Sequence, residues 1–91
     1  MSDETQQLPP ANFETLVNVL MQPAAMSMGL MAPPGQEPIV DLPQAQLMID
    51  LLRLLRERTD PQCSDDERKF VNETLDGLQR AFVAVKQQQD G

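Results

Sequence analysis

Apolar residues recur at intervals of three and four in three segments of the chain, which is the spacing of one face of an α-helix. The first series begins at Phe13 and ends at Met28, and it predicts a helix over about residues 13–31. Asn12 precedes this series and belongs to the residue types that cap helix N-termini. Pro23 falls inside the series and has no amide N–H, so we expect it to kink this helix or to split it in two.

A proline-rich loop separates the first helix from the second. Residues 32–40 hold three prolines and a glycine, a composition typical of loops. Asp41 then follows as an N-cap, with Pro43 in the first turn and Gln44 completing an Asp-x-x-Gln capping box. These signals predict a second helix over residues 41–58.

The third helix has the clearest start signal in the chain. Ser64 and Glu67 form a Ser-x-x-Glu capping box, and the two aspartates between them place negative charge at the helix N-terminus, where the helix dipole favours it. We predict a helix over residues 64–86. Its apolar positions alternate spacings of four and three, like the seam of a coiled coil: Val71, Leu75, Leu78, Phe82 and Val85.

These three helices predict an all-α fold, a small bundle or helical hairpin assembly, with no β-strand. The chain of 91 residues is long enough for one domain. We expect that domain to span residues 12–86, between disordered tails at residues 1–11 and 87–91.

The middle helix is apolar around an unusually wide arc. On a helical wheel its nine apolar residues spread over roughly 240°, whereas an ordinary surface helix shows a stripe of about 100°. Two neighbouring helices are too few to cover such an arc, and a domain of this size is marginally stable by itself. We therefore expect self-association through the second and first helices, most simply a homodimer. The alternative is a compact three-helix fold that covers every apolar side chain.

The leading functional hypothesis is a non-enzymatic helical module for oligomerisation or protein interaction, whose partner is a second copy of the chain or a helix of another protein. Methionines cluster in the first helix, and thioether side chains repack easily around a partner. The expected interaction surface consists of Leu20, Met21, Met28, Leu47, Met48, Leu51, Leu54 and Leu55.

The distribution of charge argues against nucleic-acid binding and export. The formal net charge is −7, and no Lys or Arg precedes Arg53. Nucleic-acid affinity needs clustered Lys or Arg to neutralise phosphates, so we expect no nucleic-acid partner. The N-terminus carries Asp3 and Glu4 and lacks the positive region of a secretory leader, which favours a cytoplasmic location.

The residues needed for most catalytic and metal sites are scarce. The chain has no His and a single Cys, so we expect no enzymatic activity, no metal and no cofactor. Cys63 is interpreted as an incidental loop residue, because nearby acids oppose the helix dipole that would favour its thiolate. A calcium loop starting at Asp60 would need glycine where Asp65 stands. An enzyme using carboxylates or Cys63 would need a pocket with a buried carboxylate.

A membrane-associated role is the alternative to the interaction module. The stretch Leu16–Pro34 carries no charge and is rich in methionine, so residues 13–34 suggest a peripheral membrane or lipid-associated accessory protein. Nineteen residues are barely enough to span a bilayer. The stretch also lacks the basic residues that interfacial helices normally carry, which argues against a membrane partner.

A further pattern along the chain consists of the segments Phe13–Leu16, Met28-Gly29, Gly35, Asp41–Ala45, Ile49–Leu52, Arg58-Thr59, Glu67, Leu78-Gln79 and Phe82-Val83. Through these segments, over about residues 13–85, the chain resembles a small bacterial family catalogued as domain of unknown function eighteen-forty-four. The segment Asp60–Cys63 departs from the Gly-Asn-Leu-Thr usual in that family. The resemblance implies a bacterial, cytosolic, all-α protein with no assigned activity, and it brings no catalytic or ligand residues. It highlights one polar position, Asp50, which residue chemistry explains equally well as an ion pair with Arg53.

Overall fold

The computed structural model describes residues 10–90, and the side chains as far as residue 89. Three α-helices make up most of this part: α1 (Phe13–Ser27), α2 (Leu42–Thr59) and α3 (Asp65–Asp90). A short 3₁₀ turn, η2 (Asp60–Gln62), joins α2 to α3. The described residues contain no β-strand, so the predicted all-α fold is confirmed.

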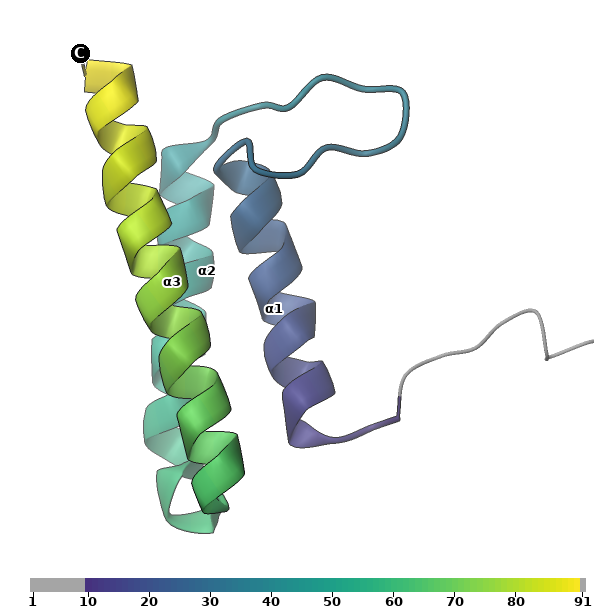
Figure 1. Cartoon of the computed structure of the whole chain (residues 1–91), viewed down its shortest axis with the longest axis vertical. Coiled ribbons are helices and arrows are strands. Elements are labelled where there is room, and N and C mark those ends of the chain that lie inside the picture. Colours follow the sequence, from purple (N-terminus) through teal and green to yellow (C-terminus); the bar gives the residue numbers. More distant parts are fainter. Residues whose placement is uncertain (1–9, 91) are drawn as a thin grey trace, which may run out of the picture.

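The helices lie side by side and alternate in direction (Figure 1). The α1–α2 loop projects from one end of the molecule, and α3 ends beside it, while the tight α2–α3 connection lies at the opposite end. Of the expected N-terminal tail, residues 1–9 lie outside the part of the chain that the structure describes.

Helix α1 begins as predicted and ends earlier. The side chain of Asn12 accepts a hydrogen bond from the Thr15 N–H at 2.9 Å, which confirms the N-cap. The helix runs through Pro23 as one element, so the proline does not split it. It ends at Ser27 rather than near residue 31.

The early end of α1 has a physical cause in Gly29. This residue has φ +77°, a left-handed conformation that glycine adopts readily. The N–H of Leu30 donates to the carbonyl oxygen of Ala25 at 3.0 Å, and the N–H of Gly29 donates to Met26 at 3.1 Å. These two bonds are the Schellman pattern that terminates helices.

The two ends of the α1–α2 loop are tied together at its base. Met28 and Val40 form an isolated antiparallel bridge. The N–H of Asp41 donates to the Ser27 carbonyl oxygen at 2.6 Å. This bond occupies the N–H that the Gln44 side chain would use in a capping box, so Asp41 caps α2 in one direction only, by accepting from the Gln44 N–H at 3.2 Å.

The capping box of α3 forms in both directions. The Glu67 N–H donates to Ser64 Oγ at 3.1 Å, and the Ser64 N–H donates to Glu67 Oε1 at 2.9 Å. The helix continues four residues past the expected end at Lys86, so residues 87–90 of the expected tail are helical. No glycine or proline lies between Gly77 and Asp90 to stop the helix, and glutamine is a good helix former.

The core lies between the three helices and is wholly apolar within the described residues. The seam predicted for α3 is confirmed, because Val71, Leu75, Leu78 and Val85 are buried and Phe82 packs against them. Helices α1 and α2 bring their own buried residues to this seam: Val17, Ala24 and Met28 from α1, and Ala45, Ile49 and Leu52 from α2.

Candidate interaction surface

Part of the wide apolar arc of α2 stays uncovered by the other two helices. Leu47, Leu51 and Leu54 are 49%, 36% and 46% exposed, whereas their neighbour Leu52 is fully buried. Spacings of four and three place the three exposed leucines on one side of α2.

Helix α1 carries a matching apolar stripe. Leu16 and Val19 are 45% and 59% exposed, and Leu20 and Pro23 are half-buried. These four residues also lie on one side of their helix by spacing. The only charged residue of α1 is Glu14, which is two positions and therefore about 200° away from Leu16 around the helix.

The two stripes meet at a shallow cavity of about 320 Å³. Leu20 of α1 lines it together with Leu51, Leu54 and Leu55 of α2, and Arg58 supplies its single charged side chain. We call the combined surface the α1/α2 apolar face; it consists of Leu16, Val19, Leu20, Pro23, Leu47, Leu51, Leu54 and Leu55.

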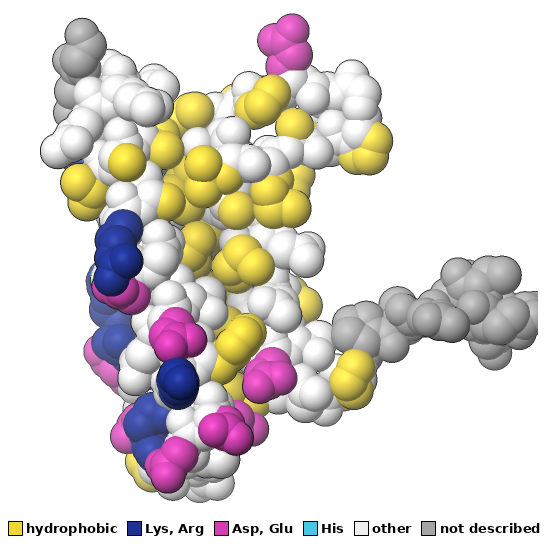
Figure 2. Space-filling view, in the orientation of Figure 1, with side chains coloured by type: hydrophobic (Ala, Val, Ile, Leu, Met, Phe, Trp, Pro, Cys, Tyr) yellow, Lys and Arg dark blue, Asp and Glu magenta, His cyan; other side chains and the backbone are white. Residues whose placement is uncertain are grey.

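The charged residues gather elsewhere. In the space-filling view, Lys, Arg, Asp and Glu side chains follow α3 down to the α2–α3 connection, while apolar side chains collect over α1 and the adjoining loop (Figure 2). On the face in view, charged side chains therefore lie mainly along α3, and apolar side chains lie mainly around α1.

Five of the eight residues expected on the interaction surface lie on the α1/α2 apolar face. Met48 is half-buried and packs against the core, and Met21 lines a different cavity, of about 280 Å³, with Leu78 and Gly77 of α3. The expected residues that lie on the face are Leu20, Leu47, Leu51, Leu54 and Leu55.

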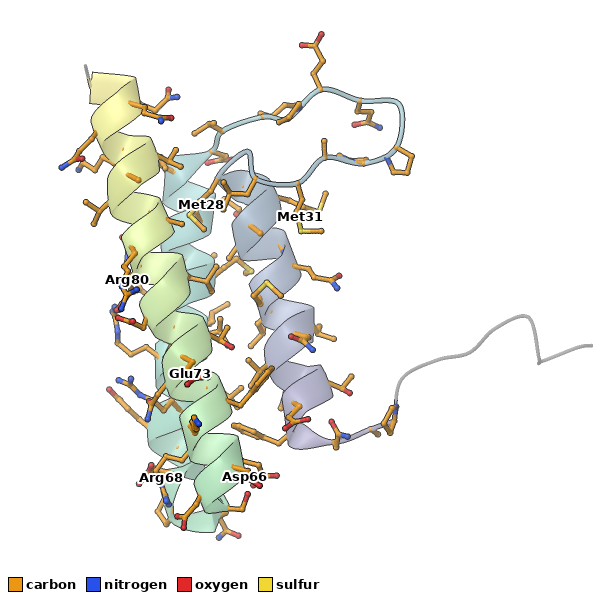
Figure 3. The ribbon with its side chains drawn as sticks, viewed as in Figure 1. Met28, Met31, Asp66, Arg68, Glu73 and Arg80 are labelled. Carbon is orange, nitrogen blue, oxygen red and sulfur yellow. The ribbon has the colours of Figure 1, made fainter. Side chains whose placement is uncertain are left out.

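The placement of Met28 on a surface was wrong. Met28 is 2% exposed and belongs to the core, because it is the C-cap of α1 and turns inward at the base of the loop (Figure 3). Met31, three residues further on, is 45% exposed (Figure 3).

Sequence reasoning missed Leu16 and Val19 as surface residues. Helix α1 has so few polar residues that periodicity alone does not distinguish its covered side from its open side. Exposed apolar side chains in the loop were missed as well: Leu30 at 55% and Ile39 at 71%. Their exposure depends on how the loop projects from the helices, which helical spacing does not encode.

The acids near Cys63 have structural partners. Arg68 Nε donates to Asp60 Oδ1 at 2.9 Å, and its Nη1 donates to Asp65 Oδ1 at 3.1 Å. The third nitrogen, Arg68 Nη2, donates to the carbonyl oxygens of Asp60 and Cys63. The hydrogen bond and charge of Asp60 raise the pKa of Arg68. The Arg68 side chain lies beside the α2–α3 connection and joins Asp60 and Asp65 (Figure 3).

The remaining candidates for chemistry are also engaged in local contacts. Cys63 is half-buried, and its thiol donates to Thr59 Oγ1 at 3.6 Å. Asp50 accepts from Gln46 at 2.9 Å and from Arg53 at 3.1 Å, in agreement with the ion-pair interpretation. Within residues 10–89 the structure shows no buried polar side chain and no group of three or more Cys, Asp or Glu residues placed to hold a metal ion.

A family model described as Domain of unknown function (DUF1844) matches residues 10–84. The chain belongs to this family. Membership confirms the resemblance found in the sequence and agrees with the all-α structure. Searches of curated proteins and of solved structures gave no match. Among the helices described for this DUF1844 member, none has the length and apolar character needed to cross a membrane.

Proposed function

We propose that this DUF1844 member is a non-enzymatic helical interaction module that self-associates through the α1/α2 apolar face. The observation that carries the proposal is the row of half-exposed leucines on α2 beside the half-exposed Leu16 and Val19 of α1. Contiguous apolar patches of this kind on a small protein mark interaction sites.

The free energy gained by burying the apolar face is of the size expected for reversible association. Burying a leucine or valine completely contributes about 1.5–3 kcal/mol, so covering half of one contributes about 1 kcal/mol. Five half-exposed residues on each of two copies give about 10 kcal/mol, the same order as the 4–15 kcal/mol that association costs. At the low end of that cost about 6 kcal/mol remains, which corresponds to a dissociation constant of tens of micromolar. We therefore expect weak, reversible self-association.

Analytical ultracentrifugation of the full chain across the micromolar range tests the proposal. The variant Leu54→Asp places a carboxylate on the apolar face and should weaken association at least tenfold, because that charge loses its hydration in the interface. Val83→Asp is the matched control: Val83 is 54% exposed on α3, outside the face, and its change should leave association unaltered.

Circular dichroism of both variants separates loss of association from loss of fold. Wild-type protein that sediments as a monomer at several hundred micromolar would overturn the proposal, and so would equal weakening by Leu54→Asp and Val83→Asp.

A second candidate function is attachment to a lipid surface through α1 and the α1–α2 loop. The exposed loop residues favour it: Leu30, Met31 and Ile39 are 55%, 45% and 71% exposed. The absence of Lys and Arg before Arg53 weakens attraction to anionic lipids. Flotation with neutral and anionic vesicles distinguishes the two functions, since lipid attachment predicts co-flotation that Ile39→Asp abolishes.

A further inference from the structure

We infer that the occupant of the α1/α2 apolar face is a second copy of this chain in reversed orientation, with α1 against α1 and α2 against α2, both antiparallel. The two-fold axis of this dimer runs across the helices and passes near Leu51 and Leu20. This inference rests on the proposed function and specifies the partner and its geometry.

The exposed leucines of α2, Leu47, Leu51 and Leu54, have nearly the same spacing when the helix is read in the opposite direction. Turning α2 end for end about a point close to Leu51 sets Leu47 of one copy against Leu54 of the other and Leu51 against itself. A two-fold interface is self-complementary in this sense, because each contact occurs twice by symmetry.

Helix α1 shows the same property. Reversal about a point between Val19 and Leu20 sets Leu16 against Pro23 of the second copy and Val19 against Leu20. One axis can serve both helices only if the two reversal points lie at the same height. Leu20 and Leu51 line the same cavity, which places both reversal points within the length of that cavity.

Charge selects this arrangement over the other two-fold alternative, in which the axis runs parallel to the helices. Helix α2 begins at the carboxylate cap Asp41, and its last turn holds Arg58, the single charged side chain at the α1/α2 cavity. Arg58 is seven residues beyond Leu51, about 10 Å along the axis, so reversal about Leu51 brings it opposite Gln44 of the second copy. Asp41 lies within one turn of that position.

The parallel axis gives no such pairing. It would place Arg58 over the start of the second copy's α1, where Glu14 lies on the side away from the face. It would also bring the two Arg58 side chains to the same end of the dimer. Reversal thus pairs opposite charges, whereas the parallel axis groups like ones.

The size of the face agrees with a reversible dimer. Helices of 15 and 18 residues, about 10 Å apart, present a surface of roughly 25 Å by 20 Å. That is about 500 Å² per copy and about 1,000 Å² in total, near the lower limit for specific interfaces.

Single-cysteine cross-linking tests the arrangement. All variants carry Cys63→Ser, which keeps a donor for Thr59. Leu51→Cys should cross-link to itself with a short bis-maleimide. Leu47→Cys and Leu54→Cys should each cross-link weakly alone and strongly when the two variants are mixed, with one of them tagged to identify the mixed product.

The alternative axis predicts a different product. A mixture of Leu20→Cys and Leu54→Cys would then cross-link, and Leu51→Cys alone would not. That result, together with a dimer in the ultracentrifuge, overturns the reversed arrangement and leaves the proposed function intact. A monomer with no cross-link in any pair overturns both.

A charge reversal provides an independent measurement. Arg58→Glu should weaken the dimer about three- to tenfold, because it places a carboxylate near Asp41 of the second copy. Arg53→Glu is the matched control, since Arg53 pairs with Asp50 away from the face. Equal dissociation constants for Arg58→Glu and wild type would contradict the reversed arrangement.

Discussion

Helix α2 has one side that faces α3 and one that faces α1, and the solvent-exposed side chains along these two sides differ in polarity. On the side toward α3, Arg56 donates to Asn72 at 3.3 Å and lines a polar groove of about 420 Å³ with Glu73 and Asp76. On the side toward α1, the border consists of leucines, with Arg58 at one end. Water hydrogen-bonds to the polar side chains of the border toward α3, but it cannot do so with the leucines of the border toward α1. Removing the leucine border from water therefore lowers the free energy more than removing the polar border.

The same contrast separates α1 from α3. Helix α1 has one charged residue, whereas α3 begins with a carboxylate-rich capping box and carries ion pairs such as Asp76–Arg80. A helix with charged residues on its solvent-facing sides needs neighbouring helices on its apolar side only. Helix α1 instead leaves apolar residues in contact with solvent, so the surface most favoured for an interaction is the α1/α2 apolar face.

The largest expected effect distinguishes the two neighbouring leucines of α2. Leu52→Ala should lower the free energy of unfolding by about 3 kcal/mol, because Leu52 is fully buried and the change leaves a cavity. Leu51→Ala, one position earlier, should cost about 1 kcal/mol in dilute solution, because the Leu51 side chain is 36% exposed and partly covered by its own copy. Urea denaturation at submicromolar concentration measures both values.

Repeating the denaturation of Leu51→Ala and Leu52→Ala at higher protein concentration extends this comparison. If the apolar face is an interface, the cost of Leu51→Ala grows as the concentration is raised, because association stabilises the folded state by mass action. A cost for Leu51→Ala that equals that of Leu52→Ala in dilute solution would contradict the difference in their burial.

An intermediate effect is expected at the charged end of the molecule. Ser64→Ala removes the acceptor of the Glu67 N–H and should lower stability by about 1 kcal/mol. The capping box lies within one copy, so this loss should be the same at every protein concentration. Thermal melts of Ser64→Ala and the control Ser64→Thr at two concentrations check it; a concentration-dependent loss would place this end in an interface.

The smallest effect is expected in the polar groove between α2 and α3. Arg56→Ala should lower stability by about 0.5 kcal/mol or less, because the hydrogen bond to Asn72 is exposed and water replaces it. Chemical denaturation of Arg56→Ala measures this loss of stability, with Arg53→Ala as the comparison variant. A loss above about 2 kcal/mol would mean that this groove is buried in solution.

Much of the fold followed from local signals in the sequence. Asn12, Asp41 and Ser64 cap the three helices as predicted, and the apolar seam of α3 is buried. These features depend on residues three or four positions apart, which is the distance over which helical geometry acts. The ends of α1 and α3 were less accurately placed, because the end of α1 is set by Gly29 together with contacts from Val40 and Asp41.

The candidate surface was predicted in part. The width of the apolar arc of α2 indicated that some leucines would stay exposed, and Leu47, Leu51 and Leu54 do. The sequence did not indicate that Met28 would turn inward or that Leu16 and Val19 would remain outside. Those outcomes depend on where α2, α3 and the loop lie around α1.

The sequence by itself therefore determined three capped helices, an apolar excess on the middle one and the scarcity of catalytic chemistry. Only the tertiary structure decided which side of each helix the excess occupies. The physical reason is that helical periodicity defines angles within one helix, whereas exposure depends on the positions of neighbouring helices that are distant in the chain.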